Sequence, residues 1–202
     1  MKIICVGRNY GLHAQELGNK PPTEPIIFCK PDTAILKNNL PFYLPEHLGE
    51  IHHEVELVVR INKVGKGIHK KFAYKYYNEI TVGIDFTART LQQKLKEQGL
   101  PWELAKAFDG SAVIGEFVPI AHETLPNTTF SLEKNGNVVQ IGNVKDMLFA
   151  IDDIISYVSR YFTLKIGDLI FTGTPQGVSS IAIGDILVGK LEDKILFTCN
   201  VK

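Results

Sequence analysis

The sequence has few cysteines and no segment that resembles a secretion signal. Its 202 residues include only Cys5, Cys29 and Cys199, an odd number without a C-x-x-C pair. This count argues against a disulfide scaffold or a zinc ribbon and favours a reducing compartment. The apolar run that begins at Met1 ends at Arg8, which is too short for a signal peptide. We therefore expect a cytoplasmic protein.

The sequence also lacks an excess of charge and a long apolar run. It has 22 basic and 22 acidic residues, so its formal net charge is zero. Because proteins that bind nucleic acid usually carry a basic excess, we expect no nucleic-acid partner. The longest uncharged stretch, residues 169–184, is interrupted by Pro175 and by glycines, so we expect no membrane span. The length fits one domain over residues 1–202.

Short apolar runs typical of β-strands dominate what remains. Asn135-Gly136 joins two of these runs and predicts a type I′ hairpin turn, in which both central residues adopt positive φ. The other runs are separated by Gly, Pro, Asn and Asp, which favour turns. The predicted strands are residues 3–6, 26–29, 54–61, 80–84, 130–134, 138–141, 168–172, 185–190 and 194–201.

Helical periodicity is confined to a few segments. Apolar residues recur at helical spacing over residues 144–162. Two shorter helices are predicted over residues 88–98 and 10–17. Since strands and helices do not alternate regularly, a Rossmann fold or an α/β barrel is excluded, and the pattern predicts a β-rich α+β fold.

An acidic pair and a later aspartate are the first candidates for chemistry. Glu54 and Glu56 alternate with apolar residues, so on a strand they would share one face about 6.6 Å apart. Such a pair can simply be the solvated face of a half-exposed strand. Asp85 ends another apolar run just before a predicted helix, where it can be a cap. Together the three carboxylates would instead form an oxygen-rich site suited to Mg²⁺ or Mn²⁺.

Three further features can be interpreted in two ways. His13 and Glu16 would lie on one helix face, where the carboxylate could orient the imidazole as a general base or form a surface ion pair. Lys106 lies among apolar residues and is either solvent-exposed or an anion-binding group. The turn at Gly173-Thr174-Pro175 is either an ordinary turn or one whose hydroxyls and backbone amides bind a carboxylate, and it lacks the ending of a P-loop.

In this order, these segments resemble the fumarylacetoacetate hydrolase family, in its acylpyruvate hydrolase and oxaloacetate decarboxylase branch. The resemblance extends over nearly the whole chain. It rests on Gly7-Arg8-Asn9-Tyr10 with His13 and Glu16, Phe28-Cys29-Lys30-Pro31, His53-Glu54-Val55-Glu56-Leu57, Asp85-Phe86-Thr87-Ala88-Arg89 with Gln92, Pro101-Trp102, Lys106-Ala107-Phe108-Asp109 and Gly173-Thr174-Pro175.

The resemblance implies a mixed β-sheet roll that forms a homodimer and binds Mg²⁺ or Mn²⁺. By position, Glu54, Glu56 and Asp85 would bind the metal. His13 and Glu16 would form a catalytic dyad on a lid segment, with Lys106 as a third catalytic residue. The residues expected to contact substrate or order the site are Arg89, Gln92, Lys30 and Thr174.

The implied activity is cleavage of a C–C bond in a small 2-oxo acid. The substrate would be an acylpyruvate that is hydrolysed or an oxaloacetate that is decarboxylated, in each case through a metal-stabilised enolate. An isomerase, hydratase or keto–enol tautomerase acting on 2-oxo diacids of aromatic catabolism is the alternative within the family. A non-catalytic β-rich binding protein is the alternative from another class.

Overall fold

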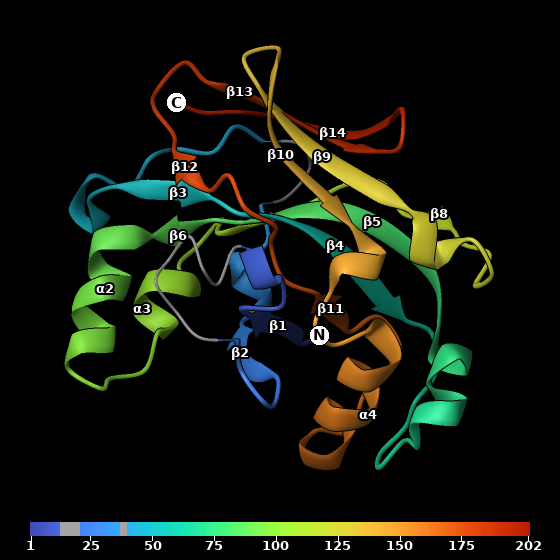
Figure 1. Ribbon diagram of the computed structural model, residues 1–202. Coiled ribbons are helices and arrows are strands. Elements are labelled where there is room, and N and C mark those ends of the chain that lie inside the picture. The colour runs from blue at the N-terminus through green and yellow to red at the C-terminus, as the bar shows by residue number, and fades with distance from the viewer. Residues whose placement is uncertain (13–20, 37–39) are drawn as a thin grey trace.

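A mixed sheet lies at the centre of the computed structural model, which describes residues 1–12, 21–36 and 40–202 (Figure 1). Within these residues the sheet has seven strands, in the order β2-β1-β11-β4-β5-β7 with β8 beside β5. The pair β1–β11 is parallel and the others are antiparallel. The strands are β1 (Ile3–Gly7), β2 (Ile26–Lys30), β4 (Val55–Ile61), β5 (Tyr77–Asp85), β7 (Ala112–Ile114), β8 (Val118–Pro119) and β11 (Leu169–Phe171).

Both faces of this sheet are buried. Along β4, Leu57 and Val59 belong to the main hydrophobic core, whereas Val58 packs on the opposite face with Cys5 and Phe171. Strands that are buried on both faces have nearly continuous apolar sequences instead of alternating ones. This explains the apolar run in β1 and the consecutive apolar residues Leu57, Val58 and Val59 in β4.

A second sheet packs across the first through the main core (Figure 1). It consists of β10 (Asn137–Asn143), β9 (Thr129–Lys134), β13 (Ile186–Leu191) and β14 (Lys194–Asn200). Asn135 and Gly136 have φ values of 54° and 80°, which confirms the hairpin prediction. A small third sheet contains β12 (Ser179–Ser180), β3 (Ile51–His53) and β6 (Thr87–Ala88).

The helices lie outside the sheets. Helix α2 (Arg89–Glu97) confirms the prediction for residues 88–98, and α3 (Glu103–Lys106) follows it. Of the predicted helix over residues 10–17, only residues 10–12 are described; Gly11 and Leu12 are helical, whereas Tyr10 forms a β-bridge instead. Short 3₁₀ helices complete the described elements: η1 (Asp32–Ala34), η2 (Glu46–Leu48), η3 (Lys70–Tyr76), η4 (Leu125–Asn127) and η5 (Val144–Asp146).

The prediction of one helix over residues 144–162 is wrong, because α4 spans only Ile151–Tyr161. The preceding residues instead bond to the segment after β1. Asn9 accepts hydrogen bonds from the backbone of Leu148 and Phe149, at 2.8 Å each, and Tyr10 forms a β-bridge with Met147. Backbone donors used in this way are not available to a helix.

The architecture confirms the β-rich α+β prediction. No helix within the described residues is long and apolar enough to cross a membrane. The first and second sheets enclose the core, while α2 and α3 lie together at one end of the molecule (Figure 1). The last residue of β5 and the first residues of β4 lie on the side of the sheet near α2 and α3, and the candidate site lies there.

Candidate metal centre and active site

The three carboxylates singled out in the sequence meet in the fold. Glu54 lies between β3 and β4, Glu56 is the second residue of β4, and Asp85 ends the adjacent strand β5. All three side chains are buried, and one carboxylate oxygen from each lies within 4.8 Å of the others. Glu54 and Glu56 therefore share a face, as predicted, and that face is buried rather than solvated.

Two buried lysines partly neutralise this group. Lys106 Nζ lies 2.7 Å from Glu54 Oε2, 2.6 Å from Asp85 Oδ2 and 2.7 Å from Thr87 Oγ1. Burial opposes the charged form of Lys106, but the Asp85 and Glu54 carboxylates outweigh it and hold the pKa of Lys106 above its usual range. Lys30 Nζ lies 2.7 Å from the other oxygen of Asp85. Of the two interpretations of Lys106 that the sequence left open, solvent exposure does not apply, because the side chain is buried against two carboxylates.

Of the three carboxylates, Glu56 has the fewest positively charged or hydrogen-bonding partners for its negative charge. The backbone N–H of Gly173 donates to its Oε2 at 2.7 Å, but within the described residues no Lys or Arg pairs with it. Burial, followed by the negative charges of Asp85 and Glu54, raises the pKa of Glu56 well above its ordinary value. A cation between the three carboxylates would relieve this repulsion.

The donor set fits a hard divalent cation. Every donor is a carboxylate oxygen, with neither thiolate nor imidazole in the group, and Mg²⁺ and Mn²⁺ prefer such ligands. The three carboxylates thus form a site able to hold a divalent metal ion.

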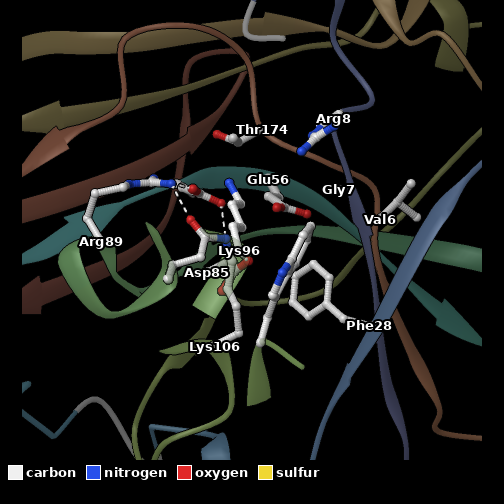
Figure 2. Close-up of a pocket in the computed structure, with 13 residues that line it drawn as sticks. Val6, Gly7, Arg8, Phe28, Glu56, Asp85, Arg89, Lys96, Lys106 and Thr174 are labelled. Atoms are coloured by element: carbon white, nitrogen blue, oxygen red, sulfur yellow. Dashed lines mark hydrogen bonds and ion pairs between the residues drawn. The ribbon is translucent and has the colours of Figure 1, made fainter. Parts of the chain in front are cut away.

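The carboxylates line a cavity that also has an apolar wall and several cations (Figure 2). Phe28, Val6 and Trp102 form much of the apolar wall, and the ring of Phe28 lies 5.1 Å from Lys106 Nζ. A site of this kind holds a small polar molecule against fixed charges while limiting water access. The complete lining is Val6, Gly7, Arg8, Phe28, Glu54, Glu56, Asp85, Arg89, Gln92, Lys96, Trp102, Lys106 and Thr174.

The structure brings most of the predicted substrate-binding residues into this cavity. Arg89, Gln92 and Thr174 line it, and Arg89 both pairs with Glu54 and donates to Gln92 Oε1 at 2.7 Å. Lys30 lies behind Asp85 and outside the lining, where its Nζ also bonds to Ser111 Oγ at 3.0 Å.

The predicted dyad, His13 and Glu16, lies outside the described residues.

Thr174 is oriented by a hydrogen-bond network that the sequence did not reveal. Gln140 Nε2 donates to Thr174 Oγ1 at 2.9 Å, while Gln140 Oε1 accepts from the backbone of Val55 at 3.0 Å. His53 Nδ1 lies 2.8 Å from the same Oε1, so it must donate, and His53 Nε2 accepts from Ser179 Oγ at 2.8 Å. Gln140 thereby connects the second sheet to the cavity.

Sequence reasoning assigned no role to two cavity cations, Arg8 and Lys96. For Lys96 a signal was present, because Arg89, Gln92 and Lys96 are spaced three and four residues apart and occupy one face of α2. Arg8 belongs to the Gly7-Arg8-Asn9-Tyr10 segment of the family resemblance, but its place in the cavity depends on the path of the chain after β1 and has no signal in the local pattern.

The comparisons with known proteins agree with the fold and the site. The model of the fumarylacetoacetate (FAA) hydrolase C-terminal family matches residues 2–197. The chain belongs to this family, and its site is that of a family enzyme with a divalent-metal centre.

Several relatives and solved structures of this family are similar to the chain over nearly its whole length. The chain is 41% identical over 199 residues to oxaloacetate tautomerase YcgM of Escherichia coli, covering 98% of this chain and 91% of that one. A fumarylacetoacetate hydrolase family protein from Yersinia pestis superposes with a TM-score of 0.94 at 40% identity, covering 100% of this chain and 93% of the other. Fumarylpyruvate hydrolase of Pseudomonas aeruginosa, solved with Mn²⁺ and pyruvate, gives a TM-score of 0.92 at 37% identity and coverages of 100% and 89%.

Proposed function

We propose that this protein catalyses the keto–enol tautomerisation of oxaloacetate with the help of a divalent metal ion. The observation that carries the proposal is the buried carboxylate group beside a cation-lined cavity. The similarity to oxaloacetate tautomerase YcgM supports the choice of substrate, and the 2-oxo acid bound in the fumarylpyruvate hydrolase supports the substrate class.

Glu54, Glu56 and Asp85 would hold Mg²⁺ or Mn²⁺. When bound, this ion would supply Lewis-acid stabilisation of negative charge on the substrate oxygens. Lys106, fixed between Glu54 and Asp85, would keep the two carboxylates apart and aligned. Lys30 would hold the second oxygen of Asp85, so the role that fits its contacts is ordering the site rather than touching the substrate.

Arg89 and Thr174 would bind the substrate. The guanidinium of Arg89 is oriented by Gln92 and Glu54 and would bind a carboxylate. Thr174 Oγ1 accepts a hydrogen bond from Gln140 and donates to Pro175 O at a long 3.4 Å, so its proton could be donated to a substrate oxygen instead.

Tautomerisation moves one proton from carbon 3 of the keto form to the 2-oxo oxygen and consumes no water. A general base must take that proton, and an acid must return one to the oxygen. We assign the base to His13, with Glu16 fixing its tautomer, as the family resemblance implies. Lys106, with its raised pKa, would stay charged and stabilise the developing negative charge instead of transferring the proton.

Hydrolysis of an acylpyruvate is a second candidate, favoured by the structural similarity to fumarylpyruvate hydrolase. In that reaction water attacks the distal carbonyl, the C–C bond breaks, and the enol of pyruvate leaves. Decarboxylation of oxaloacetate releases CO₂ and needs no water. These reactions require the same metal and carboxylate binding, so the relative rates with matched substrates decide between them.

The test follows the loss of enol absorbance from freshly dissolved oxaloacetate, with parallel assays of CO₂ release, acetylpyruvate cleavage and a dienoic 2-oxo diacid. We expect enol-to-keto conversion to be the fastest reaction, to stop in EDTA and to return with Mg²⁺ or Mn²⁺. Glu56→Gln should abolish it, whereas Glu123→Gln, at an exposed position, should not. Faster acetylpyruvate cleavage would favour the second candidate, and no metal-dependent turnover of any substrate would overturn both.

A further inference from the structure

The cations that line the cavity differ in whether they are already neutralised. Lys106 and Arg89 both contact Glu54, and Lys106 also contacts Asp85. Within the part of the chain that the structure describes, Arg8 and Lys96 form no ion pair, although both line the same cavity. Two of its cations are therefore available to bind an anion.

Lys96 is held at the cavity by its stem and its neighbours. It lies in the last turn of α2, and its Nζ is 5.2 Å from the centre of the Trp102 ring. Burial, followed by the positive charges of Arg89 and Arg8, lowers the pKa of Lys96 to about 8. A bound anion would relieve this accumulation of positive charge.

Arg8 is directed into the cavity by a strained backbone. It follows β1 directly and has a φ of 60°, a left-handed conformation that residues other than glycine seldom adopt. The next residue fixes this bend, because the side-chain Nδ2 of Asn9 donates to Thr172 O at 2.7 Å and to Phe149 O at 3.0 Å. Strain of this kind persists where the surrounding structure enforces it and is concentrated at binding sites.

Arg8 and Arg89 approach the carboxylate group from opposite sides (Figure 2). Beyond them the cavity continues into a groove lined by Arg8, Arg89, Lys96, Gln93 and Trp102, among others. The described cavity lining has three carboxylates and four cations, a formal balance of +1, which a divalent metal ion would raise to +3. A ligand with two negative charges matches this balance better than a ligand with one.

We propose that Arg8 and Lys96 form a second anion subsite, which binds the distal carboxylate of a 2-oxo dicarboxylate while Arg89 binds the other end. This inference rests on the proposed function and selects dicarboxylates, such as oxaloacetate or a longer homologue lying along the groove, over acylpyruvates with a neutral tail. With a neutral tail, Arg8 and Lys96 would lose water without gaining a partner, which is unfavourable.

The experiment compares oxaloacetate with its 4-methyl ester, which keeps the enolisable 2-oxo acid but lacks the distal charge. The variants are Arg8→Asn, because asparagine tolerates positive φ, and Lys96→Met, which preserves the apolar stem against Trp102. Arg160→Asn and Lys94→Met remove the same charges at exposed positions and serve as controls. Circular dichroism and a melting curve establish that each variant is folded.

We expect each subsite variant to lower kcat/KM for oxaloacetate about tenfold, mainly through KM, because one hydrogen-bonded charge pair is lost. The ratio of kcat/KM for oxaloacetate to that for the ester should fall by a similar factor, and both controls should keep the wild-type ratio. Equal losses on the two substrates, or a wild-type enzyme with no preference for the dianion, would overturn the subsite. Arg8→Lys should recover part of the ratio.

A binding measurement separates the subsite from the proposed reaction. Calorimetry on the Mn²⁺-loaded protein compares oxaloacetate with pyruvate, whether or not either is turned over. If turnover fails but oxaloacetate binds more tightly than pyruvate in a way that requires Arg8 and Lys96, the subsite stands and the tautomerase proposal falls. If turnover occurs and the two variants bind both ligands like the wild type, the tautomerase stands and the subsite falls.

Discussion

Lys106 provides the sharpest test of how the metal-free site is stabilised. Its side chain is 3% exposed, and its ammonium contacts Glu54, Asp85 and Thr87 at 2.6–2.7 Å, so solvent screens these contacts little. Lys106→Met keeps the volume of the stem but leaves two buried carboxylates without this partner. Removing one member of a buried ion pair costs about 3–5 kcal/mol. We expect a loss of about 3 kcal/mol or more in the free energy of unfolding.

The assay is urea unfolding in EDTA, so that metal binding does not enter the comparison. Lys194→Met is the matched control, because Lys194 lies 3.5 Å from Glu116 with both side chains largely exposed, and such pairs contribute about 0–1 kcal/mol. A loss at Lys106 no larger than that at Lys194 would refute the reasoning. It would mean that the Glu54 and Asp85 carboxylates do not depend on the ammonium for their stability.

Three further predictions concern the surroundings of the carboxylates. Glu56→Gln should abolish stabilisation by Mg²⁺ and raise the free energy of unfolding of the metal-free protein at pH values above the ordinary carboxyl pKa. Burial and the neighbouring carboxylates raise the pKa of Glu56, so the stability of its neutral form is lost as pH rises through the raised pKa, and glutamine avoids that loss. Gly173→Ala should cost more than Gly184→Ala: both have φ near 100°, but a Cβ on Gly173 would lie 2.6 Å from Asn9 Cβ, whereas one on Gly184 meets nothing within 4 Å. We expect about 1 kcal/mol at Gly184 and at least about 2 at Gly173 in urea unfolding, and equal costs would exclude the clash. Burial lowers the pKa of His53 from 6.5 to about 4, so its neutral form contributes stability above pH 6.5 that is lost as pH falls toward 4. Over this range the free energy of unfolding of the wild type should fall by about 2–3 kcal/mol more than that of His53→Asn. Parallel pH profiles of the two proteins in urea unfolding would contradict this prediction.

The sequence predicted the elements whose patterns are set locally. The 135–136 turn requires positive φ at both positions, and helix α2 has its own periodicity, so both predictions hold. The segment before α4 has equally good helical periodicity, but Asn9, well over 100 residues away in sequence, accepts hydrogen bonds from its backbone. A long-range partner of this kind leaves no trace in the local pattern.

The same distinction applies to the site. Alternation along a strand is a local property and placed Glu54 and Glu56 on one face, while the contribution of Asp85 depends on the antiparallel pairing of β4 with β5. The position of Gln140 could not be predicted from the sequence, because its side-chain amide is held by hydrogen bonds with His53, Val55 and Thr174, which belong to other segments of the chain. A single glutamine within a strand carries no sequence signal for such a position.

The roles of the cations follow from their partners rather than from their residue types. Lys106 and Lys96 both line the cavity, yet two carboxylates raise the pKa of Lys106 while burial and two arginines lower that of Lys96. The first ammonium is therefore committed to the protein's own acids, and the second remains available to a ligand. Arg89 and Lys106 already pair with the protein's own carboxylates, whereas Arg8 and Lys96 have no ion pair within the described residues, so the charge of these two is the more available to a substrate. In the proposed subsite, Arg8 and Lys96 therefore determine which substrate is preferred, whereas Glu54, Glu56 and Asp85 determine whether metal binds.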